Sequence, residues 1–307
     1  MKNKFTKGLA MTLTVSLLAV SLSVMAGCGK GSAYKDIKGP VTENEVSTWD
    51  CIWFGNYWQN TDSNGDGKVT EDDNREPLKW RVLEIDADGN AFLISDKLLD
   101  IIAFNPDEIE VTWEDCTLRS FLNNYGASAN ASGIDYSASG FMKNAFTDEE
   151  INAITVSTVV TEDNPVFGTA GGNDTQDKIF CLSFEEAVNP AYGFVKNELN
   201  GPEDGEKFIF TEEDPTRVAV STAYEDGKEG FPGKSNMSPA AWWLRSPANS
   251  AQYPDHVSGG GGAYVASLHM DKYRMCIRPV LRMNLKDASK LWKYAGTVCS
   301  DGTVNER

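Results

Sequence analysis

The residues whose spacing most clearly predicts chemistry lie between Asp62 and Asp73. Oxygen-bearing residues occupy positions one, three, five, nine and twelve of this segment, and Gly67 occupies position six. With this spacing a short loop wraps around one calcium ion, which prefers oxygen ligands. The predicted ligands are Asp62, Asn64, Asp66, the backbone carbonyl of Lys68, Thr70 and Asp73.

This loop resembles the calcium loop of an EF-hand without the complete hand. Asp73 stands at the last position, where glutamate is usual, and in this the loop resembles the dockerin version. Residues 56–59 read as a strand, so no helix is predicted before the loop. We therefore expect calcium to hold an insertion at 62–73 in shape, since a calcium sensor needs two moving helices. An acidic, solvated hairpin turn is the alternative.

The second chemical signal is a cysteine near the N-terminus. Lys2, Lys4 and Lys7 precede an apolar stretch over residues 9–26, and Met-Ala-Gly-Cys follows, ending at Cys28. A basic start, an apolar segment and small residues before a cysteine resemble the signal and lipobox of bacterial lipoproteins. The pattern predicts a signal peptide over 1–27, a lipid on Cys28, a tether over 28–46 and an extracytoplasmic protein anchored to the cell membrane. A retained transmembrane helix is the alternative.

The charge balance limits the partners of the mature chain. Residues 1–27 contain three lysines and no acidic residue, so their removal takes the formal net charge from -17 to -20. Such a chain repels nucleic acid and anionic lipid headgroups, and we expect neither as a partner. Eight tryptophans and 10% aromatic residues provide enough apolar material for a folded core.

Familiar catalytic patterns are missing from the sequence. It contains neither HExxH nor GxSxG, and only two histidines, His256 and His269. The cysteines other than Cys28 have no CxxC spacing, so we expect mostly free thiols and no metal–thiolate site. Carboxylates are numerous, and a glycosidase-type acid pair has no fixed spacing in sequence. An enzyme that uses such a pair therefore stays open as an alternative.

Strands and short helices are expected to position these residues. Residues 79–85 and 91–95 flank Asp88-Gly89-Asn90, a strong hairpin signal. Capping and apolar spacing predict helices over 113–124, after Thr112, and over 148–154. Further strands are predicted over 179–182, which a capping box at 183–186 follows, and over 241–247, 264–268 and 275–281. Residues 197–239, rich in glycine, proline and acids, are expected to be a long surface excursion.

Two arginines interrupt apolar strands in the C-terminal half. Arg245 follows the predicted structural residues Trp242 and Trp243, and Arg278 lies in the last predicted strand. Arginine is rarely buried without a carboxylate or several carbonyls. We expect ion pairs that order a β-rich core, with a clamp for a ligand carboxylate as the alternative.

Five segments in a fixed order carry a family resemblance. They are Ile52-Trp53-Phe54-Gly55-Asn56-Tyr57, Pro77 to Leu83, Thr117 to Asn123, Trp242-Trp243-Leu244-Arg245-Ser246-Pro247 and Ile277 to Leu281. Across residues 48–285 the chain resembles an uncharacterised family of surface proteins from Gram-positive gut-type bacteria, catalogued as a domain of unknown function. That family is similar to the C-type-lectin-like fold of formylglycine-generating enzymes and of variable proteins from diversity-generating retroelements.

The resemblance implies an α+β, C-type-lectin-like fold over residues 47–286 with short helices, a β-rich C-terminal half and a tail over 287–307. It also implies that the C-terminal half displays ligand-contacting loops. Tyrosine, serine, asparagine and aspartate suit adaptable binding surfaces. The candidates are Asn249, Tyr253, Asp255, His256, Ser258, Tyr264, Ser267, His269, Asp271 and Tyr273.

These observations predict a lipid-anchored module that binds an extracellular protein or glycan through residues 248–275. Outward-facing polar residues of alternating strands are the simpler explanation of the same pattern. A cell-wall or glycan-processing enzyme with a carboxylate pair and a structural envelope protein are the two alternatives from other functional classes.

Overall fold

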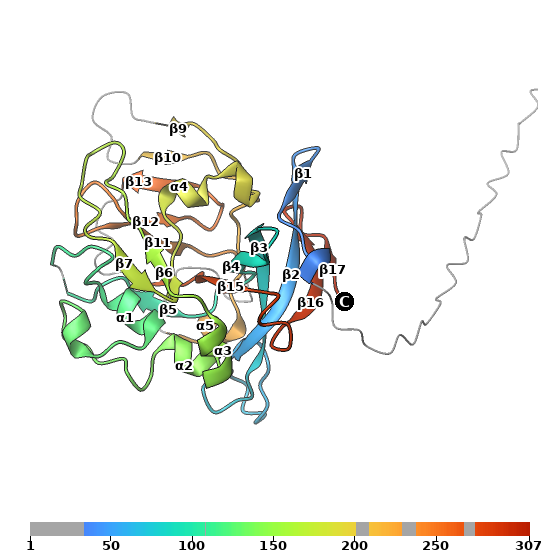
Figure 1. The fold of residues 1–307 in the computed structure, drawn as a ribbon. Coiled ribbons are helices and arrows are strands. Elements are labelled where there is room, and N and C mark those ends of the chain that lie inside the picture. Colours follow the sequence, from blue (N-terminus) through green and yellow to red (C-terminus); the bar gives the residue numbers. More distant parts are fainter. Residues whose placement is uncertain (1–33, 108, 201–208, 229–237, 267–273) are drawn as a thin grey trace, which may run out of the picture. The chain divides into compact units, whose positions relative to one another are not determined.

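The predicted hairpin at residues 79–95 is the middle of a large sheet. The computed structural model describes residues 34–107, 109–200, 209–228, 238–266 and 274–307. Within these residues, an eight-stranded sheet has the order β17-β16-β2-β3-β4-β15-β8, with β1 paired to β2 (Figure 1). Its strands are β1 (Val41–Glu43), β2 (Val46–Tyr57), β3 (Glu76–Ile85), β4 (Asn90–Ser95), β8 (Ile179–Phe180), β15 (Val280–Asn284), β16 (Lys293–Cys299) and β17 (Val304–Asn305).

A seven-stranded sheet holds Asp255, His256 and Tyr264, three of the ten predicted ligand residues. Its order is β5-β14-β11-β12-β13-β10-β9, and among its described strands only β11 and β14 pair in parallel. The strands are β5 (Ile101–Ala103), β9 (Leu199–Asn200), β10 (Ile209–Thr211), β11 (Trp242–Pro247), β12 (Pro254–Val257), β13 (Ala263–Ala266) and β14 (Arg274–Cys276). A further pair joins β6 (Ser157–Val159) and β7 (Thr175–Asp177).

The helices in the described part of the chain are short. They are α1 (Thr117–Asn123), α2 (Phe141–Ala145), α3 (Asp148–Ala153), α4 (Phe184–Ala187) and α5 (Ala223–Asp226), with 3₁₀ turns η1 (Tyr34–Asp36), η2 (Ala127–Ala129) and η3 (Pro190–Tyr192). Ser183 caps α4 through the complete capping box that the sequence predicts, and Thr147 caps α3 in the same way.

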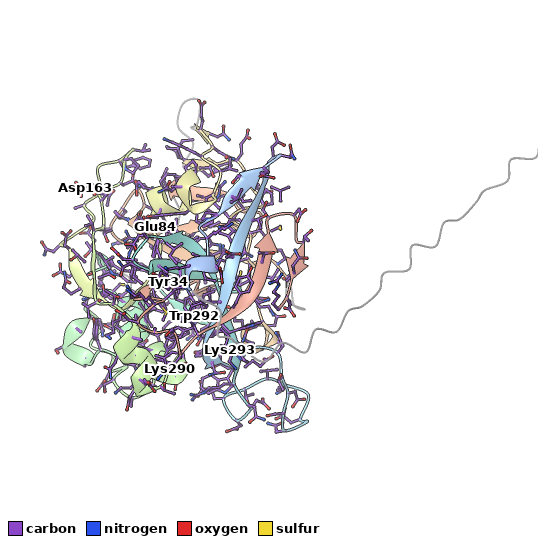
Figure 2. The ribbon with its side chains drawn as sticks, turned by 45° about the vertical axis from the view of Figure 1, so that its right-hand side comes forward. Tyr34, Glu84, Asp163, Lys290, Trp292 and Lys293 are labelled. Atoms are coloured by element: carbon purple, nitrogen blue, oxygen red, sulfur yellow. The ribbon has the colours of Figure 1, made fainter. Side chains whose placement is uncertain are left out.

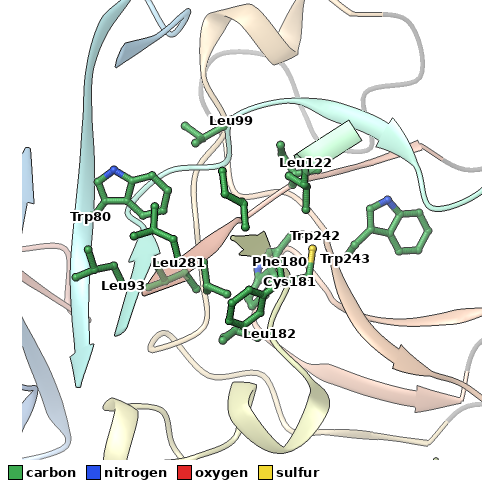
Figure 3. Packing of buried hydrophobic residues seen from close by; sticks show 14 of the residues in the cluster. Trp80, Leu93, Leu99, Leu122, Phe180, Cys181, Leu182, Trp242, Trp243 and Leu281 are labelled. Atoms are coloured by element: carbon green, nitrogen blue, oxygen red, sulfur yellow. The ribbon is translucent and has the colours of Figure 1, made fainter. Parts of the chain in front are cut away.

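One hydrophobic core joins the two large sheets. Figure 3 shows Trp80 and Leu93 of the eight-stranded sheet at the left, and Phe180 of β8 with Trp242 of the seven-stranded sheet in the middle. All four side chains are at most 3% exposed. This continuous burial is the main source of stability, because apolar surface removed from water is the dominant favourable term in folding.

The prediction of an α+β, C-type-lectin-like fold was wrong. The structure is β-rich, with 32% of residues in strands and 14% in helices, and its sheets are mostly antiparallel. The segments predicted to be helical form only short helices, between strands that pair over long sequence distances. Periodicity within a short window does not report such pairing.

Of the predicted helix over 113–124, only the second half forms. The main chain from Thr112 to Asp115 forms a turn, in which the backbone N–H of Thr112 donates to the Asp115 carboxylate at 2.8 Å. Helix α1 begins only after Cys116, whose sulfur accepts the N–H of Arg119. A local side-chain acceptor thus competes with the helix at its start.

The strand predicted over 275–281 is divided between two sheets. β14 ends at Cys276 in the seven-stranded sheet, and β15 begins at Val280 in the eight-stranded sheet. Pro279 lies in the connection, where its missing N–H costs no ladder hydrogen bond.

The ends of the domain also differ from the prediction. Residues 287–307 are not a tail, because β16 pairs with β2 and β17 pairs with β16. The tether predicted over 28–46 already contains η1 and β1. The hairpin residue Gly89 lies against the ring of Tyr34 and against Lys286, and Trp292 donates a hydrogen bond to the carbonyl of Leu285. Figure 2 labels Tyr34 and Trp292 in this region.

Candidate ligand-binding site

Three rings form a continuous stack across neighbouring strands of the seven-stranded sheet. Tyr264 on β13 stacks on His256 of β12, with ring centroids 4.5 Å apart and planes 15° from parallel. Phe210 on β10 stacks on the same tyrosine at 5.0 Å and 21°. The strand register explains the stack, because Tyr264 lies opposite both His256 and Phe210. We call Phe210, Tyr264 and His256 the ring ladder.

The ring ladder combines two half-buried rings with an unpaired polar atom. Phe210 and Tyr264 are half-buried, whereas His256 is only 8% exposed and its Nδ1 has no hydrogen-bond partner. Burial lowers the pKa of His256 to about 4, so the imidazole is neutral at pH 7. A buried polar atom without a partner is rare and costs free energy. The ring ladder therefore sets two half-buried rings beside a buried polar atom that has no partner.

Asp255 also lies in β12 but faces the other side of the sheet, because neighbouring strand residues point to opposite faces. It is 0% exposed, and neither carboxyl oxygen has a partner. Burial raises its pKa well above the usual value, and the nearby Glu185 adds to the shift. Asp255 and His256 thus do not form one site, although they are adjacent in sequence.

The other predicted ligand residues are dispersed. The Oδ1 atom of Asn249 is buried and unpaired, and Tyr253 is half-buried in a turn in which its carbonyl accepts the N–H of Ala248. Ser258 accepts the N–H of Gly262 and shapes the turn before β13. Ser267, His269, Asp271 and Tyr273, like the predicted lipidation site Cys28, lie outside the described residues.

The predicted calcium loop connects β2 and β3 and is organised by its own carboxylates. Asp73, only 7% exposed, bridges both halves of the loop: one oxygen accepts the N–H groups of Ser63 and Asn64, and the other accepts the N–H of Thr70. These hydrogen bonds, first of all that from Thr70, lower the pKa of Asp73.

Asp62 organises the first half of the same loop. Its carboxylate accepts the N–H groups of Gly65, Asp66 and Gly67. The side chains of Asn64 and Asp66 accept the N–H groups of Asp66 and Lys68 in the same way. The carboxylates of Asp62 and Asp73 thus close this loop through hydrogen bonds from backbone N–H groups. Among the described residues, however, no three His, Cys, Asp or Glu side chains converge as a metal-binding group.

The two predicted arginines have different partners. Arg245 pairs with Glu186 at 2.5 Å and donates to the carbonyls of Cys181 and Val160, which agrees with the expected ordering role. Arg278, 0% exposed, donates to the carbonyls of Ser95 and Arg217, and one of its terminal nitrogens is unpaired. Its guanidinium lies 5.2 Å from the ring of Trp242. Trp242 and Trp243 are completely buried, and the indole N–H of Trp243 donates a hydrogen bond to the carbonyl of Ile102.

Sequence reasoning missed a third buried arginine. Arg217 is 0% exposed and donates to the carbonyls of Gly261, Val195 and Glu212. It thereby ties together three segments that are distant in sequence. Because a backbone carbonyl leaves no trace in residue type, only the long-range pairing of these segments identifies this role.

A cleft of about 670 Å³ lies beside these segments and was also missed. The carboxylates that line it come from the β1–β2 turn, from the residues before β9 and from the residues after β10. They are Glu45, Glu198, Glu212, Glu213 and Asp214. The run Glu212-Glu213-Asp214 was the available signal, but nothing in the sequence places Glu45 beside it.

The comparisons with known proteins give a family without a known activity. The family model for a domain of unknown function, DUF6273, matches residues 88–285, more than half of the chain. The chain therefore belongs to this family. No curated protein and no solved structure matches it. In the described part of the chain, no helix is long and apolar enough to cross a membrane.

Proposed function

We propose that this protein is a binding module of the bacterial cell surface, anchored through a lipid on Cys28, that contacts an extracellular protein or glycan through the ring ladder. The observation that carries the proposal is the combination of half-buried Tyr264 and Phe210 with the unpaired Nδ1 of His256. Aromatic rings provide large contact areas at low entropic cost.

A concentration of unpaired atoms supports a binding role for the surrounding segment. Asn249, Asp255 and His256 contribute four of the eight buried side-chain atoms that lack partners among the described residues. Unpaired buried groups reduce the stability of the free protein, so such a concentration indicates a segment optimised for something other than stability.

The proposal includes calcium as a structural ion in the 62–73 loop. Three carboxylates, the Asn64 amide, the Thr70 hydroxyl and the Lys68 carbonyl are hard oxygen donors suited to calcium.

The acid-pair enzyme has less support than the binding module. Asp255 has the raised pKa expected of a general acid, and Glu185 lies near enough to influence it. However, both Asp255 oxygens are completely buried, so a substrate has no access to them. A structural envelope protein would differ from the binding module by showing no saturable ligand.

The proposed function is tested by screening calcium-loaded residues 29–307 against arrays of cell-wall glycans, host glycans and extracellular proteins. The affinity for each ligand found is then measured for Tyr264→Ala and for Phe210→Ala. We expect a loss of about tenfold or more in affinity for each variant, since each removes a stacking surface. Tyr136→Ala is the matched control, because Tyr136 is also half-buried and packs on one ring, that of Phe121.

Thermal unfolding of all three variants separates lost contacts from lost folding. Hits that the ring-ladder variants bind as tightly as the wild type would contradict the proposal. Product formation from any glycan would favour the enzyme instead.

A further inference from the structure

Trp53 differs from the other seven tryptophans of the chain in two respects. The other seven are at most 5% exposed, and each donates its indole N–H to an oxygen atom. Trp53 is only half-buried, and its indole N–H has no hydrogen-bond partner among the described residues. Tryptophan that keeps both ring surface and its donor open to solvent is typical of binding surfaces.

Trp53 lies outside the main core of the domain. Its ring packs on a small separate cluster of β2 and β16, formed by Cys51, Ala295 and Val298. In the strand register Trp53 lies opposite Lys293 of β16 and Lys79 of β3. The ammonium of Lys79 lies 4.8 Å from the centre of the Trp53 ring and pairs with Glu306 at 2.8 Å. These contacts hold the ring in place, so little side-chain freedom is lost when a ligand packs on it.

A β-bulge in β2 brings Asn56 to the same side of the sheet as Trp53. Their partners on β3 are Pro77 and Lys79, which are two residues apart and therefore share a face. On β2 the two residues are three positions apart, so one residue is extra and the register shifts. Gly55 allows this shift with a φ of 73°, and a Cβ atom there would come within 2.4 Å of a neighbouring ring.

A hollow of about 280 Å³ lies where the bulge places these two residues. The residues of its wall that bear on binding come from β2, α3 and the start of β16, and they are Trp53, Phe54, Asn56, Glu150, Leu291 and Lys293. A second hollow of about 220 Å³ has Trp53 and Pro77 in common with the first. The two hollows therefore adjoin across Trp53 and Pro77, an arrangement that suits an extended ligand.

Four polar groups in the first hollow are open to a ligand. Besides the N–H of Trp53, the exposed side chain of Asn56 makes no hydrogen bond within the described residues. Lys293, labelled in Figure 2, is exposed and forms no ion pair in the same part of the chain. Glu150 uses its Oε2 atom in the capping box of α3, and no described residue donates to its Oε1 atom. The hollow thus offers donors and acceptors with a net charge of zero.

We propose that this hollow binds a ring of a neutral oligosaccharide, whose apolar face packs on Trp53 and whose hydroxyl groups bond to Asn56, Glu150 and Lys293. The site is separate from the ring ladder and goes beyond the function proposed above. A sugar ring combines a face of C–H groups with a rim of hydroxyl groups, each of which both donates and accepts. The neighbouring hollow holds the next ring of the chain.

The polar groups of the hollow disfavour other classes of ligand. An entirely apolar ligand would remove water from Glu150 and Lys293 without replacing their hydrogen bonds, which costs free energy. A charged ligand would meet one like charge for each opposite charge, because the hollow contains one carboxylate and one ammonium group. A neutral ligand with many hydroxyl groups avoids both costs.

The test measures acrylamide quenching of tryptophan fluorescence in residues 29–307 while trimers of glucose, N-acetylglucosamine, mannose and galactose are added in turn. Because Trp53 is the least buried tryptophan, we expect a bound trimer to protect it from the quencher, and we expect no such protection in Trp53→Phe. Calorimetry then gives the affinity for the protecting trimer. We expect Trp53→Ala to bind it about tenfold more weakly and Asn56→Ala about fivefold more weakly.

A pair of lysine variants provides the matched control. Lys290 and Lys293 are both exposed, but only Lys293 lines the hollow. We expect Lys293→Ala to bind about threefold more weakly and Lys290→Ala to bind as the wild type does. Thermal unfolding identifies any variant that fails to fold. Asn56→Ala keeps the test informative if Trp53→Ala unfolds, because Asn56 is exposed and its replacement leaves the packing of Trp53 intact.

Three outcomes would overturn the inference. The first is that none of the four trimers protects Trp53, a result that leaves the ring ladder untouched as a site. The second is an equal affinity of Lys293→Ala and Lys290→Ala together with an unchanged affinity of Asn56→Ala. The third is a trimer that loses affinity in Tyr264→Ala but not in Trp53→Ala, since that trimer would bind at the ring ladder.

Discussion

The hydroxyl of Tyr224 on α5 donates a hydrogen bond of 3.0 Å to Glu71 in the predicted calcium loop. The residues just before the loop bind the start of α5. The side chain of Asn60 accepts the N–H of Ala223, and the carbonyl of Gln59 accepts the N–H of Tyr224. The loop between β2 and β3 is therefore attached to a helix from a distant part of the sequence, and its shape bears on the position of α5.

The same helix is joined to the core by a buried charge network. Lys228, just after α5, pairs with Asp100 at 2.5 Å, and the hydroxyl of Tyr57 donates to the other Asp100 oxygen at 2.6 Å. Lys228 also lies 4.0 Å from the ring of Tyr224. A disturbance of the loop is thus expected to reach the buried pair through Tyr224.

The first prediction concerns this attachment. Tyr224→Phe removes one hydroxyl and keeps the ring, so we expect a loss of about 1 kcal/mol in the free energy of unfolding. Equilibrium urea denaturation measures the change. Tyr294→Phe, which removes the hydrogen bond to Asp50, shows the cost of a comparable contact outside the loop. If the loop is attached to α5 in this way, adding calcium changes the loss of unfolding free energy caused by Tyr224→Phe but not the loss caused by Tyr294→Phe. The same cost with and without calcium would separate the loop from α5.

The second prediction concerns calcium itself. Calorimetric titration of metal-stripped residues 29–307 is expected to give one bound calcium ion, and Asp62→Ala/Asp66→Ala is expected to abolish it, because two predicted ligands are lost. The control is Asp86→Ala/Asp88→Ala, since Asp86 organises the β3–β4 turn through Asp88 and Asn90 in a similar way. Calcium binding by the control but not by the loop variant supports the assignment. If the wild type releases no heat and gains no thermal stability, the loop is only an acidic turn.

The third prediction concerns the pH dependence caused by Asp255. The pKa of Asp255 is raised in the folded state, so folding favours the neutral acid. This carboxyl group therefore destabilises the folded protein progressively as the pH rises above 3.8, the ordinary pKa of aspartate. Asp255→Asn is expected to raise stability at pH 7 by at least about 1 kcal/mol. The gain should shrink as pH falls toward 4, where the acid is also neutral in the unfolded chain.

Thermal unfolding at several pH values measures this difference. Asp301→Asn is the control, because Asp301 is exposed, its pKa is lowered by bonds to Thr303, and its replacement should not stabilise the protein. A constant gain for Asp255→Asn across the pH range would show that ionisation is not its origin.

The fourth prediction concerns the proposed anchor. Cys28→Ala is expected to release the protein from the membrane fraction of the expressing bacterium, since the thiol that receives the lipid is gone. Radiolabelled palmitate should enter the wild type and not the variant. Cys299→Ala is a suitable control, because Cys299 is a partly exposed free thiol of the folded domain. Labelling of Cys28→Ala at the level of the wild type would place the lipid elsewhere or exclude it.

The sequence by itself determined the local structures, because the groups that make them are close along the chain. The acidic first turn at 148–150 predicts the helix α3, and Ser183 with Glu186 predicts the capped start of α4. Both helices form, and the capping box of α4 is present. Asp88-Gly89-Asn90 predicts the turn between β3 and β4. The spacing from Asp62 to Asp73 predicts a closed loop, and Asp73 does connect both of its halves.

Only the tertiary structure decided which distant segments meet. Phe210, Tyr264 and His256 stack because β10, β13 and β12 pair in one register, and a shift of one residue would turn each ring to the other face. Glu45 joins the acidic cleft although Val195, the next lining residue along the chain, follows it by 150 residues. The α+β prediction failed for the same reason, since pairing of strands far apart in sequence depends on the packing of the whole domain rather than on any local pattern.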